Sequence, residues 1–251
     1  MDPIPPRYSV LGVDINALDL ATARRLIAQA AAEKRRGYVA FAVVSTVVAA
    51  QDDASLRAAL NGSFLTTPDG MPLVWLGKRR GGPHVDRAYG PDALLAVCED
   101  SLKSGASHFF FGGAEGVAEE LADRLKKRFP GLNVVGTFTP PFRPLNEDEE
   151  VALVEQVAAV KPDFFWVGIG SPRQEKFMAD HLGKLDTTVM LGVGAAFDFH
   201  SGRKAQAPVW MQRAGLEWLF RLITEPRRLF CRYVFGNARF LWLLMRHWEC
   251  K

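Results

Sequence analysis

The chain has few cysteines and no long uninterrupted apolar run. Its three cysteines are widely spaced and form no CxxC or metal-ligand pattern, which argues against a disulfide scaffold and fits a reducing compartment. No run of about 18 uncharged apolar residues occurs, so we expect no membrane-spanning helix. The first residues show no basic region followed by an apolar stretch, so we expect no secretion signal. These absences predict a cytoplasmic protein.

The glycine-rich fingerprint of dinucleotide-binding folds is also missing. The stretch GVGAAF, residues 192–197, comes near it, but Ala196 and Phe197 replace the third glycine. No Asp or Glu follows at about 20 residues, where the ribose ligand of that motif stands. The sequence therefore does not support a nicotinamide-dependent oxidoreductase.

The composition that is present is that of a globular protein with an uneven distribution of charge. Of 251 residues, 48% are hydrophobic and 24% charged, enough for one large domain or a domain with an appendage. Residues 202–251 carry ten Lys or Arg against three Glu, a net charge of +7, whereas residues 1–201 carry −4. A mildly acidic body with a basic tail predicts an anionic partner for the tail.

Short runs of β-branched and aromatic residues alternate with segments of helical spacing. Apolar residues recur at helical spacing in 116–129 and 148–160, for example. This alternation predicts an α/β fold with a parallel sheet and flanking helices. A boundary is expected near 201–210, and we divide the chain into residues 1–205 and a helical appendage over residues 206–251. The predicted strands are 38–45, 64–67, 108–113, 132–138, 163–170 and 187–194.

Two polar groups follow the predicted strands in positions suited to chemistry. In FLTTPDGMPLVW, residues 64–75, Asp69 comes directly after a strand. An Asp-Gly pair is commonly only a turn, but a carboxylate at the carboxyl end of a parallel strand is also placed to act as a general base. Arg87 lies in DRAYGPD, just before the predicted helix start at Gly90. Its planar guanidinium suits a phosphate, the alternative being a solvated surface arginine.

A third segment, WVGIGSPRQEKFM at 166–178, combines a strand end with a helix start. Several strands end in glycine, which lets backbone approach a phosphate or sugar closely. Ser171 is the predicted N-cap, and the free N–H groups of the helix offer a seat for a diphosphate. Gln174, one turn in, can reach a sugar hydroxyl or a base edge. The alternative is a capping-box role for Gln174 or Glu175.

The basic tail repeats arginine at helical spacing. Five arginines fall within about 40° of one another on a helix, although Pro226 and Gly236 are expected to break it. Large apolar side chains occupy the other faces, which is typical of a helix lying on anionic lipid. The alternative is a helix packed on the body with solvated arginines. Leu and Trp interleave too densely for a nucleic-acid surface. The arginines are Arg221, Arg228, Arg232, Arg239 and Arg246.

Taken together, these stretches resemble the WecG/TagA/CpsF family of bacterial glycosyltransferases, and members found with exopolysaccharide biosynthesis most closely. The resemblance implies a Rossmann-like domain that transfers a hexosyl or N-acetylmannosaminyl group from a UDP-sugar to a polyprenyl-diphosphate-linked glycan. It further implies inversion and a metal-free reaction at the inner face of the plasma membrane, and the sequence has no Asp-x-Asp motif. The pieces that carry it are PDGMPLVW, DRAYGPD, FFFGGAEGVAEE, VGIGSPRQEKF, GVGAAFDFHSG and GLEWLFRLITEPRR.

The resemblance also implies a role for individual residues. Asp69 matches the catalytic base, and an anionic membrane surface joins donor and acceptor as a partner. No cofactor, metal or nucleic acid is implied, and the assembly state stays open, with a homo-oligomer as one option. Gln174 matches a residue at the nucleotide-sugar site, and the glycines at the strand ends are predicted to bind the donor with it: Gly112, Gly113, Gly170 and Gly194. The implied ligands of the acceptor diphosphate are Arg87, Arg221, Arg228 and Arg232, the last beside Cys231, where some relatives have arginine.

One departure from the family pattern concerns the donor sugar. Many members carry a Thr, often followed by Asn or His, where Ala42 and Val43 stand here. Either the nearby hydroxyls of Ser45 and Thr46 substitute, or donor binding is altered. The departure leaves open an alternative function, that of a catalytically inactive relative serving in membrane-surface binding or assembly.

Overall fold

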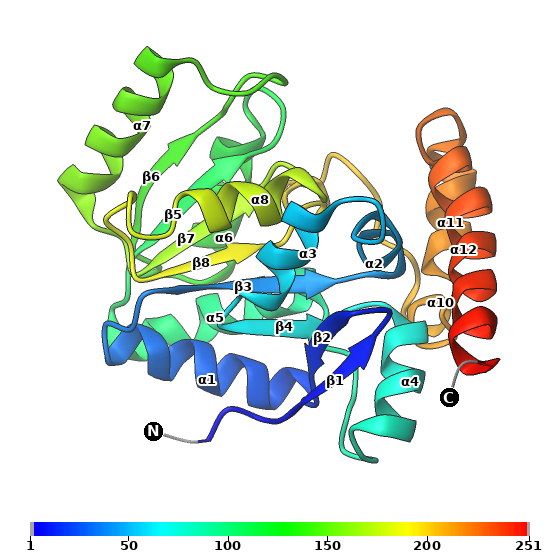
Figure 1. The fold of residues 1–251 in the computed structure, drawn as a ribbon. Coiled ribbons are helices and arrows are strands. Elements are labelled where there is room, and N and C mark those ends of the chain that lie inside the picture. The colour runs from blue at the N-terminus through cyan, green and yellow to red at the C-terminus, as the bar shows by residue number, and fades with distance from the viewer. Residues whose placement is uncertain (1–2, 250–251) are drawn as a thin grey trace.

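The computed structural model describes residues 3–249 and contains a six-stranded parallel sheet (Figure 1). The strand order is β4-β3-β8-β7-β5-β6, and every neighbouring pair is parallel. All six predicted strands are confirmed, and with them the α/β fold. The strands are β3 (Gly37–Ala42), β4 (Leu65–Pro68), β5 (His108–Gly112), β6 (Val134–Phe138), β7 (Phe164–Gly168) and β8 (Val189–Gly192).

Helices cover both faces of the sheet, which explains why most of its strands are apolar on both sides. One face packs against α1 (Leu20–Ala32), α5 (Gly90–Ser104), α6 (Val117–Arg128) and α9 (Ala196–His200). The other packs against α3 (Ala54–Asn61), α7 (Glu147–Val160) and α8 (Arg173–Asp180). Stacked rings fill the core on this second face; the rings of Phe109 and Phe165, for example, lie 5.2 Å apart between centroids.

A hairpin that the sequence analysis did not predict adds to the second face. Its strands β1 (Arg7–Val10) and β2 (Val13–Asn16) are antiparallel and joined through a two-residue turn. The side chain of Asn16 accepts a hydrogen bond from the backbone N–H of Thr66 in β4, at 2.9 Å. Tyr8 donates to the carbonyl of Leu73 in α4 (Met71–Arg80), at 3.0 Å. The hairpin therefore fixes the two elements that flank Asp69.

The C-terminal residues form three helices beside the sheet: α10 (Val209–Arg213), α11 (Glu217–Thr224) and α12 (Pro226–Glu249) (Figure 1). The predicted break at Pro226 is confirmed, but the predicted break at Gly236 is wrong, because α12 runs through it. A mid-helix glycine costs only about 1 kcal/mol. Burial of Phe240 and Leu243 against α2 (Val44–Ala49) and its neighbours outweighs that cost. Within residues 3–249, the helices lack a stretch of the length and apolarity needed to cross a bilayer.

Gly112 is expected to be one of the least replaceable residues of the sheet. Its φ is +135°, and a Cβ there would lie 2.6 Å from the carbonyl carbon of Gly168. We expect Gly112→Ala to lower the free energy of unfolding by at least about 2 kcal/mol, since both strain and a backbone clash oppose it. Gly105→Ala is the matched control: φ is +71° with nothing within 4 Å, and about 1 kcal/mol is expected. Urea denaturation that gave equal losses would contradict this.

Candidate active site

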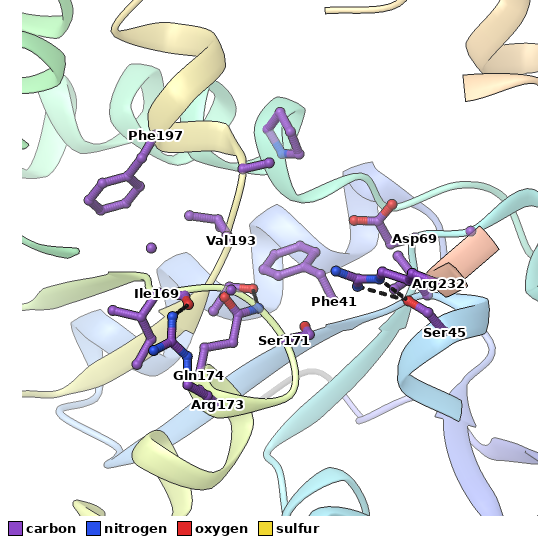
Figure 2. A pocket seen from close by; sticks show the side chains of 18 of the residues that line it. Phe41, Ser45, Asp69, Ile169, Ser171, Arg173, Gln174, Val193, Phe197 and Arg232 are labelled. Atoms are coloured by element: carbon purple, nitrogen blue, oxygen red, sulfur yellow. Dashed lines mark hydrogen bonds between the residues drawn. The ribbon is translucent and has the colours of Figure 1, made fainter. Parts of the chain in front are cut away.

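A large cavity opens at the carboxyl ends of the strands (Figure 2). Its volume is about 1260 Å³, and residues from the strand ends, from the loop at 140–145 and from α4, α8, α11 and α12 line it. Because parallel strands present their carboxyl ends at one edge, segments far apart in the sequence meet here. The cavity lies at the edge where the sequence predicts ligand binding.

Asp69 follows β4 and lies at the wall of this cavity with 6% of its surface exposed. Its Oδ2 accepts the backbone N–H of Gly90 at 3.0 Å, while Oδ1 lies 3.3 Å from Arg87 Nη2. Its own N–H donates to the carbonyl of Ala42, which anchors the segment to β3. Burial, reinforced by Glu217 and opposed by Arg87, raises the pKa of Asp69 to about 6. At neutral pH the carboxylate is mostly ionised yet more basic than an exposed aspartate.

Arg87 is held between two carboxylates. Its Nε donates to the backbone carbonyl of Asp69 at 2.6 Å, and its Nη2 donates to Glu217 Oε2 at 2.5 Å. The guanidinium stacks on the Tyr89 ring at 3.8 Å, and the Tyr89 hydroxyl donates to Glu217 Oε1 at 2.8 Å. Burial lowers the pKa of Arg87, but Asp69 and Glu217 outweigh burial and raise it. The guanidinium therefore stays charged.

Glu217 is the residue of this site that sequence reasoning missed. It is the first residue of α11 and lies within GLEWLFRLITEPRR, a stretch that carried the family resemblance. That position was its only signal, because nothing in the sequence pairs it with a residue 130 positions away. The fold brings it to Arg87 and Tyr89, beside Asp69.

Gln174 lies in the first turn of α8 and is almost fully buried at the cavity wall (Figure 2). Its Nε2 donates to the carbonyl of Gly192 at 2.7 Å. Its Oε1 points toward Gly194 and finds no hydrogen-bond partner within residues 3–249. A buried, unsatisfied acceptor at a cavity wall can receive a ligand hydroxyl or N–H.

The start of α8 differs from the prediction. Ser171 does not cap the helix, because α8 begins at Arg173 with Pro172 in the capping position. The Ser171 hydroxyl instead donates to Glu175 Oε1 at 2.5 Å. The segment from Gly170 to Ser171 still lines the cavity, so the helix start faces its interior.

Three of the four predicted glycines line the cavity, namely Gly113, Gly170 and Gly194. Gly112 is not among the lining residues, and its missing side chain instead allows β5 to approach Gly168 of β7. Gly113 donates its N–H to the carbonyl of Gly168 at 3.1 Å. The glycines thus bring two strand ends together as well as keeping the cavity open.

The appendage contributes three arginines to the cavity wall: Arg221, Arg228 and Arg232. Arg232 donates from Nε and Nη2 to Ser45 Oγ, at 3.0 and 2.8 Å, and so ties α12 to α2 (Figure 2). Arg221 stacks on Phe199, and its buried Nε has no partner in the described chain. Arg228 pairs with Glu225. This wall offers cationic donors to an anionic ligand.

The other tail arginines have different roles. Arg239 pairs with Asp52 on the body, and Arg246 stacks on Trp242, and neither lines the cavity. The predicted stripe of five therefore divides between ligand-facing and surface positions. Arg239 pairs with Asp52 although Leu241 and Leu244, further along α12, still line the cavity, so the face of the helix rather than its length separates these arginines.

The residues at the end of β3 that depart from the family pattern occupy different environments. Ala42 is fully buried, and its carbonyl accepts the N–H groups of Asp69 and Gly70. Val43 and Ser45 line the cavity, whereas the Thr46 hydroxyl is buried and finds no partner in residues 3–249. Ser45 is thus the nearby hydroxyl at the cavity wall, already engaged by Arg232.

The cavity also has an apolar part, which extends from Asp69 between α4 and α12. Trp75 and Leu76 line it from α4, and Phe240, Leu241 and Leu244 from α12. A ligand that fills both parts would be polar at one end and apolar at the other. Within the described residues, no three His, Cys, Asp or Glu side chains gather in a way that could hold a metal ion.

Comparison with known proteins gives concordant results. The sequence model described as "Glycosyl transferase WecG/TagA/CpsF family" matches residues 8–250. A Bacillus spizizenii protein named N-acetylglucosaminyldiphosphoundecaprenol N-acetyl-beta-D-mannosaminyltransferase is 30% identical over 191 residues, 76% of this chain and 72% of that protein. A Bacillus subtilis protein of the same name is 28% identical over 192 residues, 74% and 73% of the two chains.

Proposed function

Because the chain belongs to the WecG/TagA/CpsF family of glycosyltransferases, we propose that it transfers a sugar from a UDP-sugar to a polyprenyl-diphosphate-linked glycan. The resemblance seen in the sequence is confirmed, and so is the expectation of a glycosyltransferase. The names of the two relatives point to a GlcNAc-diphospho-lipid as acceptor and to N-acetylmannosamine as the sugar transferred. The proposed setting is bacterial cell-surface or exopolysaccharide synthesis.

The observation that carries the proposal is the convergence of Asp69, Gln174 and Arg232 on one cavity. Asp69 takes a proton from the acceptor hydroxyl, and the freed oxygen attacks the anomeric carbon of the donor as UDP departs. A single displacement of this kind inverts the anomeric centre. The raised pKa of Asp69, about 6, suits a general base working near neutral pH.

The leaving diphosphate needs stabilisation as it gains charge. The N-terminus of α8, preceded by Gly170, offers backbone N–H groups, and Arg221 and Arg232 offer positive charge from the C-terminal helices. The unsatisfied Gln174 Oε1 provides an acceptor for a donor hydroxyl or base N–H. These groups support a reaction without a metal, which stays a prediction.

The appendage carries a second feature that supports a lipid-bound acceptor. Six exposed apolar residues of α12 fall within about 140° of one another on the helix. We call them the outer apolar face, and it lies opposite the buried residues Leu229, Phe240 and Leu243. An exposed apolar surface flanked by arginines suits contact with an anionic membrane, so we place the enzyme peripherally on the cytoplasmic face. The six residues are Phe230, Val234, Phe235, Leu241, Trp242 and Met245.

A panel of UDP-sugars, offered with a short-chain GlcNAc-diphospho-polyprenol, tests the function. We expect one UDP-sugar, UDP-N-acetylmannosamine first among those tried, to give a β-linked product, and EDTA to leave the rate unchanged. Mass spectrometry and NMR of the product check identity and configuration. Transfer that stops on chelation would refute the metal-free mechanism.

A binding experiment distinguishes the active enzyme from the alternative, a catalytically inactive relative. Titration with UDP by calorimetry is expected to show saturable binding by the wild-type protein. Binding is expected to weaken in Gln174→Ala, which removes the unsatisfied acceptor. Absence of both UDP binding and transfer would favour the non-catalytic function.

A further inference from the structure

Glu217 has no part in the mechanism above, yet it makes two short contacts beside the base. Its carboxylate is 15% exposed and receives hydrogen bonds from Arg87 Nη2 and the Tyr89 hydroxyl. Burying a carboxylate costs desolvation free energy, and a contact that served only to hold α11 at the surface would not require that burial. Its effect is therefore to be sought at Asp69.

The distances show how Arg87 is shared. Its Nη2 lies 2.5 Å from Glu217 Oε2 but 3.3 Å from Asp69 Oδ1, so the strong bond goes to Glu217. Asp69 Oδ2 is occupied by the N–H of Gly90. Oδ1 is thus the oxygen left to accept a proton, and only a long, weak contact covers it.

We propose that Glu217 is a positioning residue for the base: it draws the Arg87 guanidinium toward α11 and leaves Asp69 Oδ1 free to take the acceptor proton. The inference rests on the proposed function, since it presupposes that Asp69 is the base. Without the Glu217 carboxylate, Nη2 closes on Oδ1 in a tight ion pair, and a carboxylate so paired is a weaker base.

The groups around Asp69 act on its pKa in opposite directions. Burial raises its pKa, Arg87 lowers it, and Glu217 raises it. Asp92 interacts with Arg87 and Glu217 rather than contacting Asp69 directly, and burial raises the pKa of Tyr89, so its hydroxyl stays neutral. Arg221 and Arg232 line the same cavity from α11 and α12. Loss of the Glu217 charge removes one influence that raises the pKa of Asp69 and strengthens one that lowers it.

The pH dependence of kcat/KM tests this. In the wild-type enzyme the acidic limb is expected near pH 6, with activity rising as Asp69 loses its proton. In Glu217→Gln, which keeps the shape of the side chain, we expect the limb to move to lower pH by at least about half a unit. The plateau kcat falls about tenfold, while KM for the UDP-sugar is unchanged, because a weaker base slows only the chemical step.

Two further variants separate positioning from folding. Glu217→Asp keeps the charge, but its shorter side chain cannot reach both Arg87 and Tyr89. The acidic limb of its pH profile is therefore expected to move to lower pH by less than in Glu217→Gln. If Glu217→Gln does not fold, Glu217→Asp provides the test by itself. Tyr89→Phe is the matched control: it removes the other contact of Glu217 but no charge, and its limb stays in place.

Each outcome is decisive for one of the two proposals. A limb that stays put or moves upward in both Glu217 variants, with Asp69→Asn inactive, overturns the positioning role alone. Near-normal transfer by Asp69→Asn overturns the proposed mechanism itself. A fall in activity with lower thermal stability and an unmoved limb would show that Glu217 only docks α11.

Discussion

Replacing Asp69 by asparagine is expected to lower kcat at least about 100-fold. The amide has the shape of the carboxylate and can still accept the N–H of Gly90, but it cannot take a proton from the acceptor hydroxyl. The ground state is little changed, so KM for the UDP-sugar is expected to stay within about twofold. Steady-state kinetics with the lipid-linked acceptor measures both constants.

The stability of this variant provides an internal check. The pKa of Asp69 is raised in the folded protein, so its contribution to stability is fully present below the unfolded pKa and is lost as pH rises through about 6. Asparagine carries no such charge, and the melting temperature of Asp69→Asn at pH 7.5 is therefore expected to equal or exceed that of the wild type. Asp92→Asn, in the first turn of α5 and outside the cavity lining, is the matched control for transfer. Turnover close to the wild-type rate would show that Asp69 is not the base.

Substituting serine for Phe230, Phe235 and Trp242 together is expected to lower binding to anionic vesicles at least about 100-fold. Full burial of each such side chain in an apolar phase stabilises by about 1.5 to 3 kcal/mol. Even partial insertion of all three accounts for the expected loss. These side chains belong to the outer apolar face and are 51%, 65% and 51% exposed, so the fold should survive their replacement. Sedimentation with vesicles measures the partition.

The control for this variant is Val151→Ser, an exposed apolar residue on α7, far in the chain from the appendage. It is expected to leave vesicle binding unchanged. Binding by the wild type should also weaken as salt is added, because the arginines contribute charge attraction that counter-ions screen. If the triple variant sediments with vesicles as the wild type does, α12 is not the membrane contact.

Much of the fold followed from local sequence patterns. The six strands are short apolar runs such as HFFFGG at 108–113, and the helices between them have their own periodicity, so each element is specified by its own residues. The sequence also predicted which edge of the sheet carries the site, because the carboxyl ends of parallel strands lie on one side. Asp69 and Gln174 could be chosen for that reason, together with the family resemblance.

Elements that depend on tertiary packing were not predicted from the sequence. The hairpin of β1 and β2 was not predicted, since it is held by contacts to Thr66 and Leu73 far along the chain. The helix α12 continues through Gly236 because Phe240 and Leu243, beyond the glycine, pack against the body. Local propensity alone favours a break there, and tertiary contacts reverse the balance.

The class of fold, the family and the residue types at the strand ends can be read from the residues alone, because hydrophobic period and short motifs are local properties of the chain. How those residues interact depends on the three-dimensional packing. It placed Glu217 against Arg87, Arg232 against Ser45, and Ala42 in the core rather than in the cavity. Electrostatic effects at a buried base depend on distance and burial, and neither is set until the appendage docks on the sheet.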